Sequence, residues 1–571
     1  MNNADIGKIM LEIGELLEIK GDMIFKIRAY LKAAEILSTY PEDLVKLYKE
    51  TGIKGLTQIP GIGEGLAKKL EELFNTGKIK YFEDLKKELP EGLLELLSVQ
   101  GVGPKKAKIF FEELGIKDLK GLEKAVKSGK LKGLKGMGEK TEENILKGIE
   151  YRKKGNERMR LGDALPIAEG LIKELKAAGA KEAVFAGSLR RGKETAGDID
   201  ILVTAKEHGK AIEAFTSFER VSRVLAKGGT KASILTKDGI QADLRVLAPD
   251  EFGAALNYFT GSKDHNVLLR ELAIKKGLKL SEYGVFKGEK RFASKTEEEV
   301  YRALGLPYIE PELREGRGEI EAALNGKLPR LVELGDIRGD LHMHTAASDG
   351  TGSIRELVSA AKKKGYEYIG ITDHSASLKV ARGLSSELLL KRIKEIETLN
   401  KNLKGLRVLC GSEVDIKPDG TLDYNDGLLS RLDYAIGSVH TSFRMKKDDM
   451  TKRVIRAFKS GRMKIFGHPT GRLLNEREPY EIDMGEVISA AAGEGVALEL
   501  SASPYRLDLT DINCRAAKEK GALVSINTDS HAIGELDNMK YGVTTARRGW
   551  LEKNNVINCL SLKALLRFLA K

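Results

Sequence analysis

The sequence predicts a multidomain α+β protein, and three features along the chain predict it. Residues 1–150 carry apolar positions at helical spacing, broken by glycine turns. Residues 155–250 contain short apolar runs that are typical of strands, with a helix or two between them. From residue 336 onward short strands alternate with longer helical stretches, which indicates repeated βα units and favours a barrel. A chain of 571 residues is also too long for one hydrophobic core, so we expect several domains.

The composition favours a cytoplasmic protein with an anionic partner. The formal net charge is +12, and nucleic acid is the commonest partner of such a protein. The three cysteines, Cys410, Cys514 and Cys559, are scattered and odd in number, which fits a reducing compartment. No apolar run approaches the ~20 residues of a membrane span, and the N-terminus lacks the apolar core of a signal peptide. No oligomerisation motif stands out, so we expect a monomer.

Three related segments of the helical region place an apolar residue before a Gly-x-Gly turn and a helical stretch after it. The glycines permit a tight turn between two helices. The second helix then begins with free backbone N–H groups and a positive dipole end, which suit a phosphate. The segments are LTQIPGIGEGLAKKL (56–70), LSVQGVGPKKAKI (97–109) and LKGLKGMGEKTEENI (131–145).

These segments resemble the helix-hairpin-helix (HhH) motif, which binds the DNA backbone without reading sequence. The first two copies have a small residue, Ala67 or Ala107, in the second helix, whereas the third has Glu142 there and is degenerate. The alternative is ordinary packing of helix pairs, and two good copies in one basic region favour DNA. The glycines that we expect to contact DNA are Gly61, Gly63, Gly101 and Gly103.

The stretch AVFAGSLRRGKETAGDIDILV (183–203) predicts a site for a triphosphate. A strand ends at Gly187-Ser188, and a helix begins there, so backbone N–H groups and a hydroxyl can surround phosphates. Arg190 and Arg191 follow, and one of them, which we take to be Arg191, can reach the same phosphates.

Three aspartates follow in a pattern that suits divalent metals. Asp198 and Asp200 lie at i and i+2 of a strand and therefore face one side, while Ile199 and Ile201 face the core. After a hairpin turn at Asp238-Gly239, Asp243 lies on the polar face of another strand. Three carboxylates on neighbouring strands suit two Mg²⁺ or Mn²⁺ ions, which offset their mutual repulsion. The alternative is a surface strand with solvated acids.

Histidines and acids in the C-terminal region follow one rule, because each comes at the end of a short apolar run. In a βα barrel the C-terminal ends of the strands converge on one face, where active sites form. A cluster of imidazoles and carboxylates suits Zn²⁺ or Mn²⁺. The expected ligands are His342, His344, Asp349, His374, Glu413, His440, His468, Asp529 and His531.

The pattern Gly-Ser, Asp-x-Asp and a third Asp resembles the nucleotidyltransferase superfamily, and within it a family X DNA polymerase. The segment NYFTGSKDHNVLLR (257–270) adds to the resemblance. By this resemblance Asp198, Asp200 and Asp243 are catalytic, and the partners are dNTPs and gapped or primer–template DNA. It also implies that Tyr258, Phe259, Gly261 and Asn266 contact the incoming nucleotide, and that Arg245 and Arg270 contact DNA.

The N-terminal region resembles the domain of the same family that binds a downstream 5′-phosphate in a gap. Lys26 and Tyr30 match phosphate-binding positions, and Lys69 matches the Schiff-base lysine of members that excise a deoxyribose phosphate. Phe25 replaces a usual histidine, and Gly65 stands where relatives have another lysine. We expect crowding by Lys68 to lower the pKa of Lys69. The alternative for Lys69 is a charge on a solvated helix face.

The C-terminal motifs HxH, TDH, an isolated Glu, GSVH, GHP and DxH resemble a PHP (polymerase and histidinol phosphatase) domain. The resemblance implies a distorted (βα)7 barrel with up to three metals, Glu413 as a bridging ligand, and Mn²⁺-dependent 3′→5′ exonuclease activity, sometimes with cleavage at abasic sites. Asp349 lies about where some relatives use histidine. Asp340 shares the strand face of His342, which suggests a contact behind the metal ligands.

The whole chain is therefore expected to be a repair polymerase that fills short gaps, as in base excision repair, and trims ends. Two alternatives are a different nucleotidyltransferase fused to a small-molecule phosphatase, and a DNA-binding scaffold whose catalytic sites have decayed. The HhH copies and the YFTGS segment argue against the first, and the complete set of acids and histidines argues against the second. The expected domains are a helical gap- and 5′-phosphate-binding domain (1–90), a second HhH subdomain (91–154), a nucleotidyltransferase palm with a mixed sheet (155–251), a nucleotide-pocket subdomain (252–317), a linker (318–335) and the PHP domain (336–571).

Overall fold

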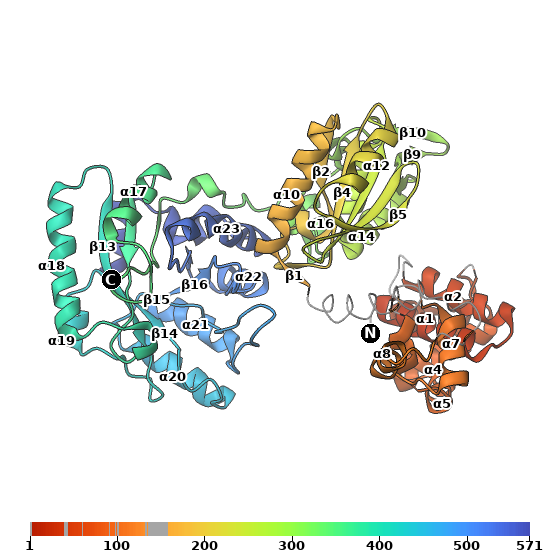
Figure 1. Ribbon diagram of the computed structural model, residues 1–571, viewed down its shortest axis with the longest axis horizontal. Coiled ribbons are helices and arrows are strands. Elements are labelled where there is room, and N and C mark those ends of the chain that lie inside the picture. The colour runs from red at the N-terminus through yellow and green to blue at the C-terminus, as the bar shows by residue number, and fades with distance from the viewer. Residues whose placement is uncertain are drawn as a thin grey trace. The chain divides into compact units, whose positions relative to one another are not determined.

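The computed structural model describes residues 3–38, 44–59, 61–90, 92–97, 99, 102–131, 134, 145 and 158–570. The chain forms two compact units, which are described separately (Figure 1). One contains Met1–Glu157 and Val267–Lys275, and the other contains Arg158–Asn266 and Lys276–Lys571. In the described ranges no helix is long and apolar enough to cross a membrane.

The N-terminal unit is helical, as the spacing of its apolar residues predicts. Its core is formed by side chains such as Leu16, Leu70 and Phe110, which are almost fully buried. The helices are α1 (Asn3–Lys20), α2 (Ile24–Ser38), α3 (Leu44–Thr57), α4 (Glu64–Thr76), α5 (Lys80–Glu88), α6 (Gly92–Leu97), α7 (Pro104–Leu114) and α8 (Leu119–Lys127).

The first two glycine hairpins connect helix pairs, α3 to α4 and α6 to α7. Gly61 has a φ of +91°, which favours glycine, and Gly63 and Gly103 are the extended N-cap residues of α4 and α7. A Cβ atom placed on Gly63 or Gly103 would have no neighbouring atom of another part of the chain within 4 Å. Another molecule can therefore approach these helix N-termini closely. Gly101 and most of the third hairpin, including Glu142, lie outside the described residues.

The second unit begins with a five-stranded mixed sheet in the order β2-β4-β7-β6-β5. β4 and β7 are parallel, and the other neighbours are antiparallel. Ile199, Ile201 and Leu244 point from the sheet into the core. The elements are β1 (Met159–Arg160), α10 (Leu161–Ala177), β2 (Glu182–Phe185), α11 (Gly187–Arg190), β3 (Thr195–Ala196), β4 (Asp198–Thr204), α12 (His208–Ser217), β5 (Val221–Lys227), β6 (Lys231–Thr236) and β7 (Gln241–Leu247).

A smaller α/β subdomain follows the mixed sheet. It contains a three-stranded antiparallel sheet in the order β10-β9-β8. Fully buried Arg314 pairs with Glu297 at 2.6 Å and lies over the rings of Tyr301 and Tyr308. The elements in this part of the chain are α13 (Phe252–Thr260), α14 (Lys263–Lys275), β8 (Lys279–Ser281), β9 (Gly284–Lys287), β10 (Lys290–Ala293) and α15 (Glu297–Ala303), and the part of α14 from Val267 to Lys275 belongs to the first unit.

The segment that we expected to be a linker, 318–335, starts with a helix packed against this subdomain, and its residues Leu331 and Val332 pair with Glu552 and Leu551 of the barrel part. Its helix α16 (Glu319–Leu324) begins at a fully buried carboxylate. Glu319 accepts a hydrogen bond from His265 Nδ1 at 2.7 Å and from the backbone N–H groups of Gly316 and Arg317. A buried carboxylate with three partners fixes the start of this segment in place, and its assignment as a linker stays a prediction.

The C-terminal part is a barrel of seven parallel strands in chain order. The first and last strands meet through the parallel bridge Met343–Ser530 and the His344 N–H to Ser530 carbonyl bond, which close the barrel. The predicted distorted (βα)7 barrel is confirmed. The strands are β11 (Gly339–Asp340), β12 (Tyr368–Ile371), β13 (Arg407–Asp415), β14 (Tyr434–Ser438), β15 (Ile465–Phe466), β16 (Ala497–Ser501) and β17 (Val524–Asn527).

Helices cover the outside of the barrel, as Figure 1 shows in green and blue. Strands of a parallel sheet are buried on both faces, which explains why all seven consist almost entirely of buried residues. The helices are α17 (Ile354–Lys363), α18 (Ser386–Asn402), α19 (Asp426–Leu429), α20 (Lys447–Lys459), α21 (Met484–Glu494), α22 (Asp511–Lys520), α23 (Met539–Arg548) and α24 (Leu562–Leu569).

Candidate active sites

The three predicted aspartates lie on neighbouring strands of the mixed sheet. Asp200 on β4 stands directly opposite Asp243 on β7, and Asp198 lies two residues before Asp200 on the same face. Gln241 donates to both oxygens of Asp243, at 3.1 and 2.9 Å. Burial, followed by the charges of Asp198 and Asp243, raises the pKa of Asp200 to about 7. Such repulsion is relieved when cations bind, so the residues fit divalent metals.

The start of α11 lies against this acidic face. Gly187 has a φ of +62°, and a Cβ at this position would stand 2.4 Å from Asp200 Oδ2. Only glycine therefore allows the turn to approach the carboxylate this closely. The neighbouring Ser188 Oγ is buried and has no hydrogen-bond partner in the part of the chain that the structure describes. A hydroxyl in this state fits a polar ligand, as the sequence predicts.

The arginine that ends α11 and the arginine that follows it are engaged inside the protein. Arg191 donates from Nε to Glu315 at 2.9 Å and from Nη1 to the Thr260 carbonyl. Arg190 donates to the two carboxylate oxygens of Glu297 at 2.9 and 2.6 Å. Arg191 is buried, so its guanidinium fixes α11 to the end of α13. Its predicted contact with phosphate stays a prediction, and this arrangement does not favour it.

The YFTGS segment brings the predicted nucleotide contacts together. The rings of Tyr258 and Phe259 lie 5.1 Å apart at 79°, and the Arg245 guanidinium lies 4.3 Å from the Phe259 ring centre. Asn266 donates to the Tyr258 carbonyl at 2.7 Å. Gly261 follows α13 with a φ of +65°. The rings are thus held on both sides, by a cation and by an amide. Arg270 lies on α14.

The predicted N-terminal residues gather around Tyr81, a residue that no motif in the sequence indicated. Lys69 Nζ lies 4.4 Å and Lys26 Nζ 4.8 Å from the Tyr81 ring centre, and the Tyr30 ring stacks at 6.4 Å. Burial lowers the pKa of Lys69, and the charge of Lys26 lowers it further. The cation whose charge lowers the pKa of Lys69 is therefore Lys26, on the neighbouring helix α2, and not Lys68 as we expected.

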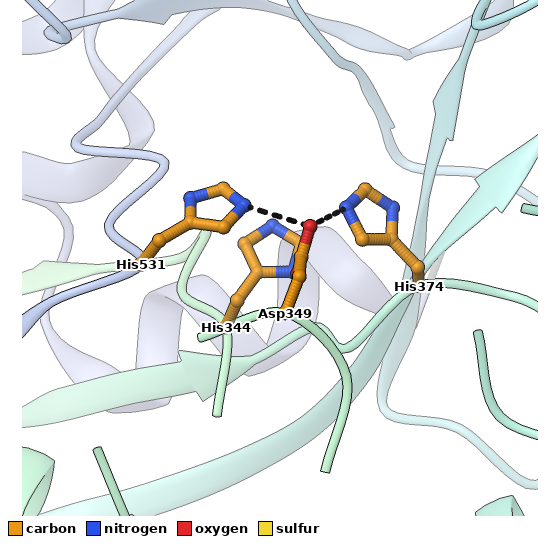
Figure 2. A group of neighbouring side chains, drawn as sticks. All are labelled: His344, Asp349, His374 and His531. Atoms are coloured by element: carbon orange, nitrogen blue, oxygen red, sulfur yellow. Dashed lines mark ion pairs between the residues drawn. The ribbon is translucent and has the colours of Figure 1, made fainter. Parts of the chain in front are cut away.

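The barrel brings all nine of its predicted ligands to one end. Among the described residues, three groups of His and acid ligand atoms lie within 4.8 Å of one another, and all three groups are in the barrel. The carboxylate oxygens of the three aspartates on the mixed sheet are therefore farther apart than the ligand atoms within each of these groups. The groups are His344, Asp349, His374 and His531 (Figure 2), then His342, His344 and Asp529, and finally His374, Glu413 and His440.

Glu413 connects the three groups. Its Oε2 lies 2.9 Å from His374 Nδ1, and 3.4 and 3.5 Å from the Nε2 atoms of His342 and His344. Its Oε1 lies 3.2 Å from His440 Nε2 and 2.9 Å from His468 Nε2. One buried carboxylate between five imidazoles is the arrangement that a bridging metal ligand requires.

The donor atoms fit metal ions. His342 Nε2, both nitrogens of His344 and His374 Nδ1 are buried and have no hydrogen-bond partner among the described residues. Carboxylate oxygens of Asp349, Glu413 and Asp529 nevertheless lie within 3.6 Å of them. Buried imidazole nitrogens that face carboxylates without hydrogen bonding are explained by cations between them.

Two carboxylates that the sequence analysis missed hold the imidazoles from behind. Glu499 accepts from His342 Nδ1 at 2.7 Å and from the His468 backbone N–H at 2.7 Å. Asp415 accepts from His440 Nδ1 at 2.6 Å. Each contact fixes the ring so that Nε2 faces the metal-binding groups. The available signal was an acid inside an otherwise apolar strand, ALELS for Glu499 and SEVD for Asp415.

Two other acids near the barrel mouth support backbone and loops. Asp373 accepts from the Thr345 N–H at 2.8 Å and from Ser348 Oγ at 2.8 Å, which fixes the turn after His344. Asp340 accepts from the His342 backbone N–H at 3.2 Å and from Thr528 Oγ1. Asp340 therefore supports the backbone of His342 rather than its imidazole.

Comparisons with known proteins agree with this division. Family models match as a helix-hairpin-helix domain (1–79), a SAM-like helix-hairpin-helix tandem (93–150), a DNA polymerase beta palm (167–244), a DNA polymerase beta thumb (255–315) and a PHP domain (340–503). A curated Bacillus subtilis protein described as DNA polymerase/3′-5′ exonuclease PolX is 41% identical over 578 residues, which covers 100% of both chains.

Other relatives match the barrel alone. A probable phosphatase of Shewanella sp. (strain MR-4) is 31% identical over 242 residues, which cover 41% of this chain and 91% of that protein. A probable phosphatase of Thermoanaerobacter sp. (strain X514) is 28% identical over 230 residues, 38% of this chain and 89% of that protein. The match over the full length, together with the palm, thumb and PHP models, decides the assignment. The chain belongs to the family X DNA polymerases that carry a C-terminal PHP domain.

Proposed function

We propose that this polymerase fills short gaps during DNA repair, as in base excision repair, and that its barrel removes nucleotides from 3′ ends. The observation that carries the proposal is the presence of two separate sets of metal-binding side chains on one chain, one on the mixed sheet and one in the barrel. The B. subtilis relative, similar over its whole length, is named for both activities.

On the mixed sheet, Asp198, Asp200 and Asp243 would hold two Mg²⁺ or Mn²⁺ ions. Such ions supply the charge that activates a primer 3′-hydroxyl and stabilises the triphosphate. Gly187 and Ser188 would bind the phosphates of a dNTP through backbone N–H groups and the free hydroxyl. Tyr258 and Phe259, supported by Arg245 and Asn266, would lie against its sugar. Arg270 would contact the DNA.

In the barrel, the nine predicted ligands would hold up to three Zn²⁺ or Mn²⁺ ions. Such ions supply an activated water and stabilise the charge of a phosphodiester under attack. Glu499 and Asp415 keep the imidazoles oriented for this task. Cleavage at abasic sites would use the same residues, because it breaks the same type of bond.

The helical unit would hold the DNA beside the gap. The N-termini of α4 and α7, at Gly63 and Gly103, offer backbone N–H groups to phosphates, with Gly61 in the turn before α4. From the sequence alone, Gly101 would contact the DNA beside α7. Lys26 and Tyr30 would bind the downstream 5′-phosphate. We also propose that the protein acts in the cytoplasm as a monomer, which light scattering at working concentration tests.

The main test uses a one-nucleotide-gapped duplex with a labelled primer, Mn²⁺, and dNTPs present or absent. We expect Asp243→Ala to abolish primer extension and leave shortening, and His344→Ala to abolish shortening and leave extension. Asp238→Ala in the exposed β6–β7 turn and Asp448→Ala on exposed α20 are the matched controls. No extension by the unaltered chain refutes the gap-filling proposal. Extension without shortening refutes the exonuclease, and a 4-nitrophenyl phosphate arm then tests the barrel as a phosphatase.

We further propose that Lys69 forms a Schiff base with the deoxyribose phosphate left at an incised abasic site. Its nitrogen is partly buried and its pKa is lowered, which favours the neutral amine that such a reaction needs. Borohydride trapping on incised abasic DNA should give a covalent complex that Lys69→Ala abolishes. The control is Lys68→Ala, one residue away and exposed. Equal trapping by both variants would place the reactive amine elsewhere.

A further inference from the structure

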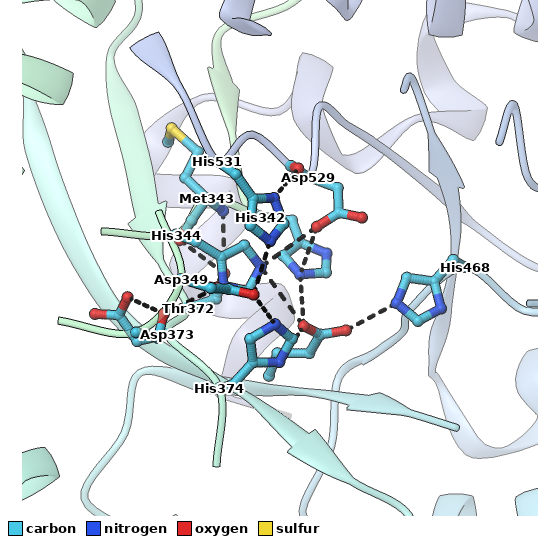
Figure 3. A network of polar contacts seen from close by, with 12 residues as sticks. His342, Met343, His344, Asp349, Thr372, Asp373, His374, His468, Asp529 and His531 are labelled. Carbon is cyan, nitrogen blue, oxygen red and sulfur yellow. Dashed lines mark hydrogen bonds and ion pairs between the residues drawn. The ribbon is translucent and has the colours of Figure 1, made fainter. Parts of the chain in front are cut away.

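A surface loop begins directly after the metal-site residue His374. It comprises residues 375–384 and is called the 375–384 loop here. A bridge between Ser375 and Leu384 closes its base, and the Leu384 N–H donates to the His374 carbonyl at 2.8 Å. Both ends of the loop are therefore attached at the barrel mouth, beside an imidazole that belongs to two of the three metal-binding groups (Figure 3).

Hydrogen bonds hold the loop in one conformation. The Ser375 N–H donates to the Glu413 carbonyl at 2.9 Å, and the Ser377 N–H donates to Asp423 Oδ2 at 2.8 Å. Tyr424 donates from its hydroxyl to the Leu384 carbonyl at 2.6 Å. A loop anchored by this many bonds is preorganised for a contact, so that little conformational entropy is lost when it binds.

The loop presents an apolar side chain between two cations. Val380, in a short 3-10 turn (Lys379–Ala381), is 90% exposed, while the next residue, Ala381, is buried and anchors the turn. Lys379 and Arg382 are exposed, and their side chains make no ion pair or hydrogen bond with any other residue that the structure describes. Scattered exposed apolar residues are common in proteins. Val380, however, is a β-branched residue at the tip of an anchored loop, and it lies between two unpaired cations and beside a metal site. This combination indicates a ligand with apolar and anionic parts.

We propose that the 375–384 loop separates the last base pair of a DNA duplex, so that the 3′-terminal nucleotide enters the barrel as a single strand. This inference rests on the proposed exonuclease. The metal-binding side chains lie deep in the barrel, where His342 and His344 are almost fully buried, so a paired and stacked end must open before its phosphodiester reaches them. Val380 packs against the exposed face of the next base pair, and Lys379 and Arg382 bind flanking phosphates. Apolar wedges of this kind stabilise unstacked base steps in other DNA complexes.

The test compares removal of the terminal nucleotide from four substrates in Mn²⁺. They are a blunt paired duplex, the same duplex with two mismatched 3′ nucleotides, the single strand, and bis(4-nitrophenyl) phosphate. We expect Val380→Gly to slow cleavage of the paired end about tenfold, the effect of about 1.4 kcal/mol on a barrier, and to leave the other three rates unchanged. Val380→Thr keeps the branched shape and should retain most of the activity. Leu388→Ala, an exposed apolar residue on nearby α18, is the control.

The double variant Lys379→Gln/Arg382→Gln tests the phosphate contacts. It should raise the KM for duplex DNA and lower the slope of log affinity against log salt by about 2, one per phosphate contact. The proposal is overturned if Val380→Gly slows all four substrates equally, since the loop then only supports the metal site. It is also overturned if paired and mismatched ends respond alike. If the unaltered chain cleaves none of the four substrates, the exonuclease proposal falls and the role of the loop falls with it.

Discussion

Replacement of Glu499 by glutamine tests whether the buried carboxylate behind His342 tunes the barrel metals. Glu499 is fully buried and accepts three hydrogen bonds of 2.7–2.8 Å. Its Oε1 serves His342 Nδ1 and Asn527 Nδ2, and its Oε2 serves the His468 backbone N–H. Glutamine has one acceptor oxygen and one NH₂ group. Whichever way the amide turns, its NH₂ group therefore faces at least one of these donors.

The size of the effect follows from that mismatch. A buried donor left without an acceptor costs about 1–3 kcal/mol, and loss of such a contact behind a metal ligand lowers metal affinity about 10–100-fold. We expect Glu499→Gln to bind Mn²⁺ about that much more weakly and to lose exonuclease activity at limiting Mn²⁺. Excess Mn²⁺ should restore part of it.

Calorimetric titration with Mn²⁺ and metal analysis after dialysis measure the effect without relying on activity. Glu494→Gln, an exposed acid at the end of α21, is the matched control. Primer extension should be unchanged, because the residues that we assign to it lie on the mixed sheet. If Glu499→Gln binds Mn²⁺ as tightly as the unaltered chain, the reasoning is wrong, and Glu499 only fills space in the barrel.

Two further changes probe the mixed sheet and its neighbour. Gly187→Ala should abolish most primer extension and leave the exonuclease intact. The alanine Cβ would lie 2.4 Å from Asp200 Oδ2, and the positive φ would destabilise the alanine backbone by about 1–2 kcal/mol. Normal extension by this variant would show that the turn can move. Glu297→Gln should lower the unfolding free energy by about 3–5 kcal/mol at pH 7, since it leaves buried Arg314 unpaired. Burial acts to raise the pKa of Glu297, but Arg314 and Arg190 outweigh it and hold the pKa at about 2. Because the folded-state pKa is lowered, the ionised carboxylate stabilises the fold fully at pH values above the ordinary pKa of 4.5. Urea unfolding should therefore show that the difference in unfolding free energy between the variant and the unaltered chain shrinks as the pH falls from 4.5 towards 2. A difference that does not depend on pH would refute the ion pair as its cause.

The sequence predicted well which side chains gather at one end of the barrel, because one geometric rule governs their positions. In parallel βα units every strand ends at the same face, so residues such as His374 and His531, far apart in the chain, are placed together by topology alone. The aspartates of β4 and β7 followed from the two-residue repeat of strands in the same way. In both places backbone periodicity decides where the side chain points.

Other features depend on tertiary contacts, which local sequence patterns do not encode. Glu319 lies in a Pro- and Gly-rich stretch that indicates a linker, and only its buried contact with His265 shows that the segment is folded. Arg191 is a plausible phosphate ligand by position, but Glu315, more than a hundred residues away, engages its guanidinium. Tyr81 reaches Lys69 from another helix, which no local pattern encodes.

The same Glu315 also joins the mixed sheet to the barrel. It accepts from Arg191 at 2.9 Å and from Arg548 of α23 at 3.0 Å, and Arg548 also donates to the Arg191 carbonyl at 2.7 Å. These side chains are less than a tenth exposed. Loss of Glu315 would leave the Arg191 guanidinium without its carboxylate partner, at a cost of about 3–5 kcal/mol. Leu507 and Tyr541 of the barrel extend the core of the sheet as well. Separation of the two domains would therefore expose both charges and apolar surface.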